Sequence, residues 1–82
     1  MNVIYTGYAI DVIKDRKIKE GLIESALLNP DGLVEGKKGR KIAHKIIGDA
    51  LLRVIYEIDN KTYIVITAYY AHSKRYKNES EL

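Results

Sequence analysis

The stretch from Thr62 to Tyr70 is a nearly continuous run of apolar and β-branched side chains. A run of this kind, with little polar alternation, is typical of a β-strand that has both of its faces covered. It therefore predicts a central strand, which needs neighbouring strands and a covering layer. The chain has 82 residues, so we expect all of these partners to come from a single domain.

Short strands and tight turns precede this run. Glycine, aspartate and asparagine tolerate the backbone conformations of turns, and they separate several β-prone segments. The pattern predicts strands at 33–35, 40–47 and 51–58, turns at 36–39, 48–50 and 59–61, and an edge strand at 3–5.

Two helices are predicted before the strands of the second half. Thr6 can cap the first, whose apolar side chains gather on one side and which ends near Arg16. The second runs from about Lys19 to Leu28. Asn29-Pro30-Asp31-Gly32 ends it and turns the chain.

This order of elements predicts an α+β fold. We expect a short N-terminal strand, two helices, and then a three- to four-stranded antiparallel sheet, because consecutive strands usually pair. The predicted domain covers residues 1–76, and residues 77–82 form a polar tail.

Composition excludes several classes of site. The chain has no cysteine and two histidines, so disulfide frameworks and thiolate metal sites are excluded, and no metal or cofactor is predicted. No apolar run approaches the roughly 18 residues that a membrane-spanning helix needs. The N-terminus has no basic region followed by an apolar stretch, so we expect a cytoplasmic protein without membrane contact.

The positive charge is concentrated in one short segment. The formal net charge is +3, yet residues 37–45 hold five basic residues and no acidic one. Such a concentration favours an anionic partner. The segment contains Lys37, Lys38, Arg40, Lys41 and Lys45.

Side-chain alternation assigns the faces of the strand at 51–58. Leu52, Val54 and Tyr56 share one face, which we expect to lie against the helices. Arg53 then points to the opposite face.

The faces of the strand at 40–47 depend on the following turn. A two-residue turn at Gly48-Asp49 would place Lys41, Ala43 and Lys45 in the core beside Val54. A three-residue turn shifts the register by one and reverses every side chain. Because burying two unpaired lysines costs several kcal/mol, we expect the longer turn. It predicts Lys41 and Lys45 beside Arg53, with His44 in the core.

The last strand is predicted to end near the same basic face. Ile64, Ile66, Ala68 and Tyr70 are expected on the face of Arg53. His72, Lys74, Arg75 and Tyr76 then follow and could fold over that face.

Cations on a shallow sheet face can bind phosphates, and tyrosines can stack on unpaired bases. The same groups suit metal-free RNA cleavage, in which a base removes the 2′-hydroxyl proton, cations stabilise the phosphorane and an acid protonates the 5′-oxygen. Two plainer interpretations remain open. A lysine row is often only a solvated face, and His44 is more often a structural core residue.

Three segments resemble the RelE/ParE toxin superfamily. Gly48 to Tyr56 is similar to its strand–turn–strand signature, Ile64 to Tyr69 to its next strand, and His72 to Tyr76 to its basic, tyrosine-containing C-terminus. The N-terminal half resembles the BrnT-like branch and other small uncharacterised toxins. That similarity lies in Tyr8-Ala9, where the branch usually has a histidine first, in Arg16-Lys17-Ile18 and in Pro30-Asp31.

The resemblance implies a RelE-like fold and a prokaryotic type II toxin that cleaves mRNA without a metal. Its partners would be a cognate antitoxin and mRNA, in some members on the ribosome. It implies catalytic roles for Lys45, Arg53, Arg75 and Tyr76, with Lys74 as an alternative to Arg75. RNA-binding roles are expected for Lys37, Lys38, Arg40, Lys41, His72 and Lys74. The alternatives are a non-catalytic toxin-like domain that binds nucleic acid or an antitoxin, and an interaction domain that pairs through an edge strand.

Overall fold

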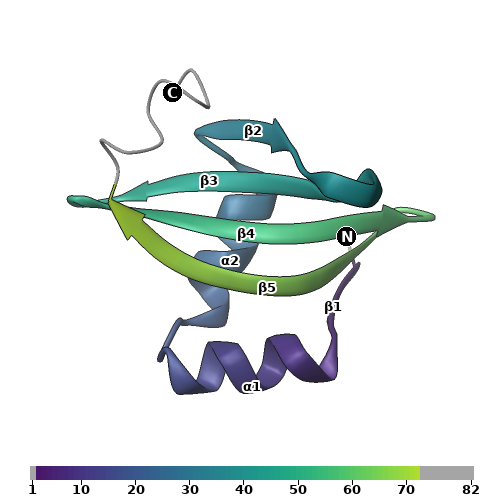
Figure 1. Cartoon of the computed structure of the whole chain (residues 1–82), viewed down its shortest axis with the longest axis horizontal. Coiled ribbons are helices and arrows are strands. Elements are labelled where there is room, and N and C mark those ends of the chain that lie inside the picture. Colours follow the sequence, from purple (N-terminus) through teal and green to yellow (C-terminus); the bar gives the residue numbers. More distant parts are fainter. Residues whose placement is uncertain (1, 73–82) are drawn as a thin grey trace.

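The computed structural model describes residues 2–72 and has an α+β fold (Figure 1). A short strand and two helices come first, and the remaining strands follow, in the predicted order. The elements are β1 (Asn2–Tyr5), α1 (Gly7–Asp15), α2 (Glu20–Leu28), β2 (Gly32–Glu35), the short 3₁₀ helix η1 (Lys37–Gly39), β3 (Lys41–Ile47), β4 (Ala50–Asp59) and β5 (Thr62–His72).

The strands form one mixed sheet of five strands in the order β1-β5-β4-β3-β2. The four later strands pair antiparallel, as predicted, but β1 joins the sheet parallel to β5. The middle strand is therefore β4, and β5 lies between β4 and the short edge strand β1. The prediction that β5 is covered on both faces is wrong, since only Val65 and Ala68 of its residues 62–72 are buried.

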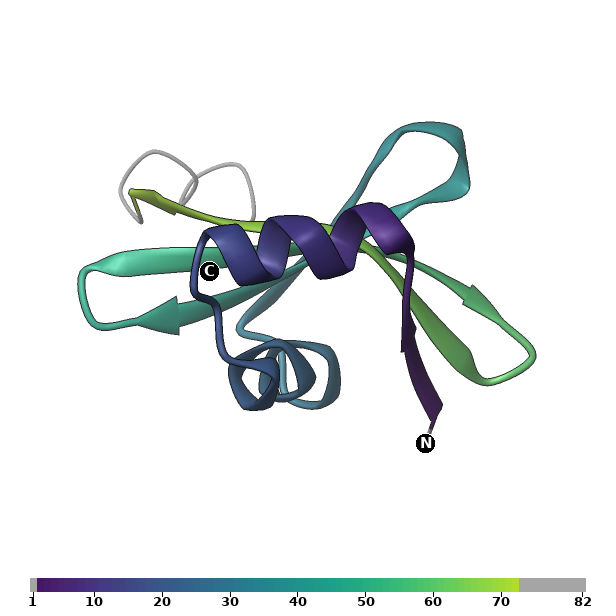
Figure 2. The same cartoon turned by 90° about the horizontal axis from the view of Figure 1, so that it is seen from below.

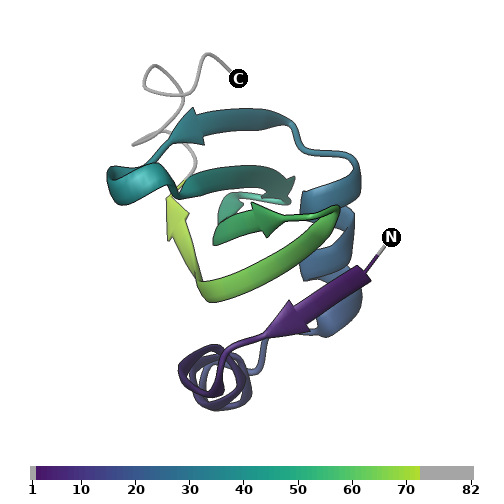
Figure 3. The same ribbon diagram turned by 90° about the vertical axis from the view of Figure 1, so that its right-hand side faces the viewer.

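Both helices lie on one side of the sheet. Helix α2 packs against β3 and β4, and α1 packs against β5 and β1. Figure 1 shows α2 behind the middle of the sheet and α1 along its β5 edge, and Figures 2 and 3 show the same arrangement from two other sides. No helix within residues 2–72 is long and apolar enough to cross a membrane.

The first helix begins and ends through specific backbone contacts. The Thr6 side chain accepts a hydrogen bond from the Ala9 amide at 3.0 Å and so acts as the predicted N-cap. Lys17 has a positive φ of 55° just after the helix, which reverses the chain toward α2. Ile18 in this connection is buried, so the reversal also contributes to the core.

The core lies between the two helices and the sheet. Leu52, Val54 and Tyr56 face the helices, as the alternation of β4 predicted. They pack with residues from both helices, from the connection between them, and from β3 and β5. These are Ala9, Ile13, Ile18, Ile23, Ala26, Leu27, Ala43, Val65 and Ala68.

The turn between β3 and β4 has two residues, and the predicted three-residue turn is wrong. Ile47 pairs with Ala50, and Gly48 adopts a φ of 61°, a conformation that glycine takes without strain. In this register Ala43 lies opposite Val54 in the core, and His44 lies opposite Arg53 on the other face. The predicted basic row beside Arg53 is therefore absent from the sheet.

The two lysines of β3 avoid the predicted burial cost. Lys41 and Lys45 lie on the helix side, but both side chains remain partly exposed. The Lys41 Nζ donates to Glu35 Oε1 at 3.1 Å, and the Lys45 Nζ donates to the Asn29 carbonyl at 2.8 Å. A long lysine side chain lets the ammonium group reach a polar partner even where the backbone is covered. Ala43, which lies between them on the same side of β3, is completely buried.

A β-bulge reverses the faces of the second half of β5. Ile55 pairs with Thr67 whereas Tyr56 pairs with Val65, which leaves Ile66 as the extra residue. Beyond it, Tyr69 pairs with Arg53 and Ala68 with Val54. The prediction that Ala68 and Tyr70 share the face of Arg53 is therefore wrong, because it assumed an unbroken alternation.

Tyr5 has an unsatisfied hydroxyl and lines a pocket. The Tyr5 oxygen is buried and has no hydrogen-bond partner among the described residues. With Ile13, Ile18 and other residues it lines a pocket of about 250 Å³ between β1, α1 and the start of α2. Burial raises the pKa of the Tyr5 hydroxyl, and Glu20 and Glu24 raise this pKa further.

Replacement of Tyr5 by phenylalanine should therefore change the pH dependence of stability more than stability itself. At pH 7 we expect a change within about 1 kcal/mol, because the hydroxyl has no described partner to lose. Above pH 10 the unfolded wild type deprotonates before the folded form, so its stability falls as pH rises toward the raised pKa. The stability of Y5F should fall less over the same pH range. Urea unfolding at pH 7 and pH 11 measures this, with Y8F as the control at an exposed position. An equally steep fall in Y5F would contradict the prediction.

Candidate nucleic-acid interface

The sheet face opposite the helices, here called the open face, is built around Arg53. Alternation along β4 puts Leu51, Arg53 and Ile55 on this face, since Leu52 and Val54 point to the helices. Register then places His44 of β3 on one side of Arg53 and Tyr69 of β5 on the other. Directly opposed residues on neighbouring strands bring their side chains into contact range.

Arg53 is held on this face by an aromatic ring and by burial. Its side chain is only 5% exposed, and its Cζ lies 5.7 Å from the centre of the Tyr69 ring. A cation over a ring in a desolvated site contributes about 2 kcal/mol. The face therefore keeps a fixed positive charge among apolar neighbours such as Ile55 and Leu51.

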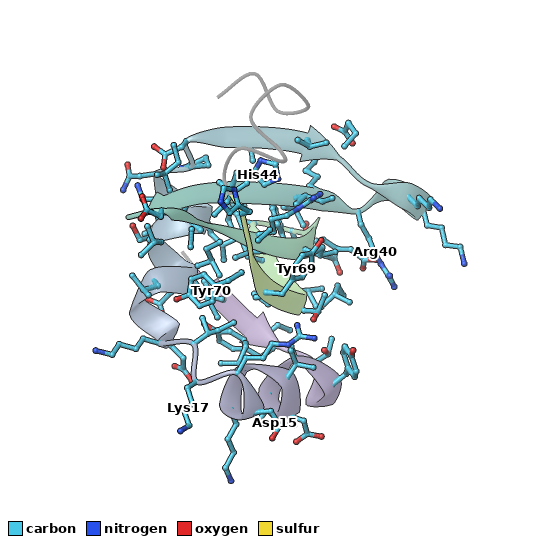
Figure 4. The ribbon with its side chains drawn as sticks, turned by 60° about the vertical axis from the view of Figure 1, so that its left-hand side comes forward. Asp15, Lys17, Arg40, His44, Tyr69 and Tyr70 are labelled. Atoms are coloured by element: carbon cyan, nitrogen blue, oxygen red, sulfur yellow. The ribbon has the colours of Figure 1, made fainter. Side chains whose placement is uncertain are left out.

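A second arginine reaches the same ring from outside the sheet. Arg16 follows the last turn of α1, and its Nη1 donates to the Ala68 carbonyl of β5 at 2.7 Å. Its Cζ lies 6.0 Å from the centre of the Tyr69 ring. The side chains of Arg16, Arg53 and Tyr69 are called the arginine–tyrosine cluster below. In Figure 4, Tyr69 and Tyr70 point to opposite sides of β5.

His44 lies on the open face and is completely buried. The prediction that it belongs to the core is correct for its burial and wrong for its face, because of the two-residue turn. It sits opposite Arg53, where the three-residue turn would have placed Lys45 beside the arginine. The observed register therefore places the His44 imidazole, and not the predicted Lys45 side chain, opposite Arg53.

The other predicted site residues are dispersed. Arg40 lies toward the far end of the open face and pairs with Glu57, with its Nε 3.3 Å from Oε2. Lys37 and Lys38 are exposed in η1. His72 is exposed at the end of β5 and, paired with Ala50, falls on the helix side.

Three predicted residues cannot be placed. Lys74, Arg75 and Tyr76 lie outside the described residues, so their roles stay predictions. Within residues 2–72 no group of three histidine, aspartate or glutamate side chains could hold a metal ion.

Arg16 was not among the predicted site residues. The sequence pattern marked it only as the end of a helix and as part of a family-like junction. Its place beside the Tyr69 ring depends on how α1 lies along the edge of β5, some fifty positions later in the chain. No local pattern carries that information.

Two helices against one side of a mixed sheet, with an arginine–tyrosine cluster at the other side, define a small α+β domain with a candidate anion-binding face. The family model described as a domain of unknown function, DUF4258, matches residues 5–70, and the chain belongs to this family. The matched segment includes the whole cluster. Neither the curated proteins nor the solved structures contain a match to this chain.

Proposed function

We propose that this protein is a RelE-like toxin that binds RNA at the open face and cleaves it without a metal ion. The single observation that carries the proposal is the arginine–tyrosine cluster, in which two guanidinium groups lie about 6 Å from the centre of one tyrosine ring. Guanidinium groups bind phosphate oxygens through paired donors, and aromatic rings and guanidinium planes both stack on unpaired bases.

Arg53 stabilises the negative charge of the pentacoordinate phosphorus in this proposal. Its near-complete burial supports the role, because a fixed charge acts more strongly where water is excluded. Tyr69 is half-buried and Arg16 is exposed, so RNA approaches Arg53 past these two side chains.

His44 has a positioning role in the proposal. It is completely buried opposite Arg53, so it supports the arginine rather than contacting RNA. Lys45 is on the helix side and does not serve as the catalytic base at Arg53. In this proposal the proton-transfer groups are Arg75 and Tyr76, which lie outside the described residues.

The toxin assignment follows from the resemblance together with the order of the elements. A short strand, two helices and an antiparallel meander are the order expected of a RelE-like fold. The partners would be a cognate antitoxin and mRNA in a prokaryotic cytoplasm, with cleavage either on the ribosome or free of it.

A second candidate function is binding without catalysis. One observation favours it: Lys41 and Lys45 are engaged by Glu35 and by the Asn29 carbonyl instead of lining the site with Arg53. A domain with this arrangement would hold nucleic acid or an antitoxin and leave RNA intact.

The two functions are separated by one set of measurements. Expression of the wild type should arrest bacterial growth, and the purified protein should cleave RNA in excess EDTA, with and without ribosomes. RNA that is bound but uncut would support the binding module. If RNA is neither bound nor cut and growth continues, the proposed function is wrong.

A further inference from the structure

Helix α1 is attached to the edge of β5 at both of its ends. Strand β1 pairs with β5 only as far as Val65, so the carbonyls beyond this point lack a strand partner on that side. The Thr6 hydroxyl donates to the Ile66 carbonyl at 3.4 Å, and Arg16 donates to the Ala68 carbonyl at 2.7 Å. The second attachment places a guanidinium group at the border of the open face.

Arg16 is exposed and yet has a defined position. One of its nitrogens is engaged by Ala68, and the Tyr69 ring lies 6.0 Å from its Cζ. A guanidinium group has five N–H donors, so several remain for a ligand. A side chain already held in one place loses less entropy when it binds, which favours affinity.

Arg16 also differs from Arg40 and Lys41 in that no carboxylate of the described residues neutralises its charge. Arg40 pairs with Glu57, and Lys41 pairs with Glu35. Arg16 makes no ion pair with any residue in the range 2–72. Its charge is therefore available to an anion, a few ångströms from the ring that also holds Arg53.

We infer that Arg16 is an RNA-binding residue that contacts a backbone phosphate next to the one that Arg53 engages. This inference rests on the proposed function and adds a residue from α1 to a site otherwise built from the sheet. The ligand class is single-stranded RNA, because the exposed guanidinium plane and the half-buried Tyr69 ring suit an unstacked base.

The test uses Arg16→Gln, because the glutamine amide can still donate to the Ala68 carbonyl while the charge is lost. Affinity for a fluorescent single-stranded RNA that resists cleavage is measured over a series of salt concentrations. We expect about tenfold weaker binding at low salt. The slope of log K against log salt should also fall by about 0.7, the value for one lost phosphate contact on a single strand.

Two variants serve as controls. Lys14→Gln removes one exposed charge from the same helix, and its slope should equal that of the wild type. Arg16→Lys keeps the charge, so it should keep the slope even where affinity falls. Urea unfolding of each variant shows whether the fold is intact.

Each outcome has one meaning. Absence of RNA binding by the wild type overturns the proposed function and this inference with it. Binding by the wild type with an unchanged slope in Arg16→Gln overturns the inference alone. The inference is also overturned if Arg16→Gln weakens binding of a polyglutamate peptide but not of RNA, since Arg16 would then face an acidic protein partner. The inference is contradicted, too, if Lys14→Gln lowers the slope of log K against log salt as much as Arg16→Gln does.

Discussion

Replacement of Ala43 by lysine should strongly destabilise the fold. Ala43 of β3 is completely buried in the core on the helix side of the sheet, next to Val54 of β4. A lysine there would bury a charge without a partner in a close-packed site, at a cost of about 4 kcal/mol or more. Domains of this size are typically stable by about 5–15 kcal/mol, so a large part of the stability would be lost. Circular dichroism and urea unfolding measure the result.

Ile46→Lys is the matched control on the same strand. Ile46 points to the open face and is 47% exposed, so a lysine there reaches water and should cost less than about 1 kcal/mol. The three-residue turn reverses this expectation, because it places Ala43 on the exposed face and Ile46 in the core. A stable A43K together with an unfolded I46K would show that the described register is wrong.

Replacement of Arg53 by lysine should lower the rate of RNA cleavage by about 10²–10³, if the proposed function holds. Loss of one group that stabilises charge in a transition state has an effect of this size. Lysine keeps the positive charge but loses the planar fork that binds two phosphate oxygens and stacks on Tyr69. The rate constant is measured under single-turnover conditions in EDTA, with the unfolding midpoint measured in parallel because Arg53 is buried.

Lys45→Gln tests whether Lys45 acts beside Arg53, as the three-residue turn predicts, or lies away from it, as in the observed register. The Lys45 Nζ lies against the Asn29 carbonyl on the helix side, so its charge is remote from the cluster. Its loss should change the cleavage rate much less than the loss of the Arg53 guanidinium. If K45Q and R53K lower the cleavage rate equally, Lys45 acts together with Arg53, as the predicted basic row requires. An unchanged rate in R53K would contradict the role of Arg53.

Prediction of the fold from sequence succeeded where the signals are local. Thr6 was expected to cap α1, Asn29-Pro30 to end α2, and Leu52 and Val54 to face the helices, and the structure confirms each of them. These features depend on side chains within a few positions of one another. The pairing of β1 with β5 joins residues some sixty positions apart, and no local pattern indicated it.

Prediction of the side-chain faces around Arg53 failed at two single-residue shifts. One residue fewer in the turn after Ile47 moved Lys41 and Lys45 away from Arg53 and brought His44 to it. One residue more in β5, at Ile66, moved Tyr69 to the face of Arg53. Each shift reverses every side chain beyond it, so a small error in register became a large error in the composition of the site.

The sequence by itself determined the class of fold, the order of its elements, the face that β4 turns to the core and the face on which Arg53 stands. The tertiary structure alone decided what surrounds Arg53. The predicted penalty for turning two lysines toward the helices assumed that both would be fully buried, whereas on this side only the middle of β3 is buried. Ala43 is buried there, while Lys41 and Lys45 reach polar partners at its two ends. Burial depends on where distant elements lie, and for the same reason only the folded chain could bring Arg16 to the ring of Tyr69.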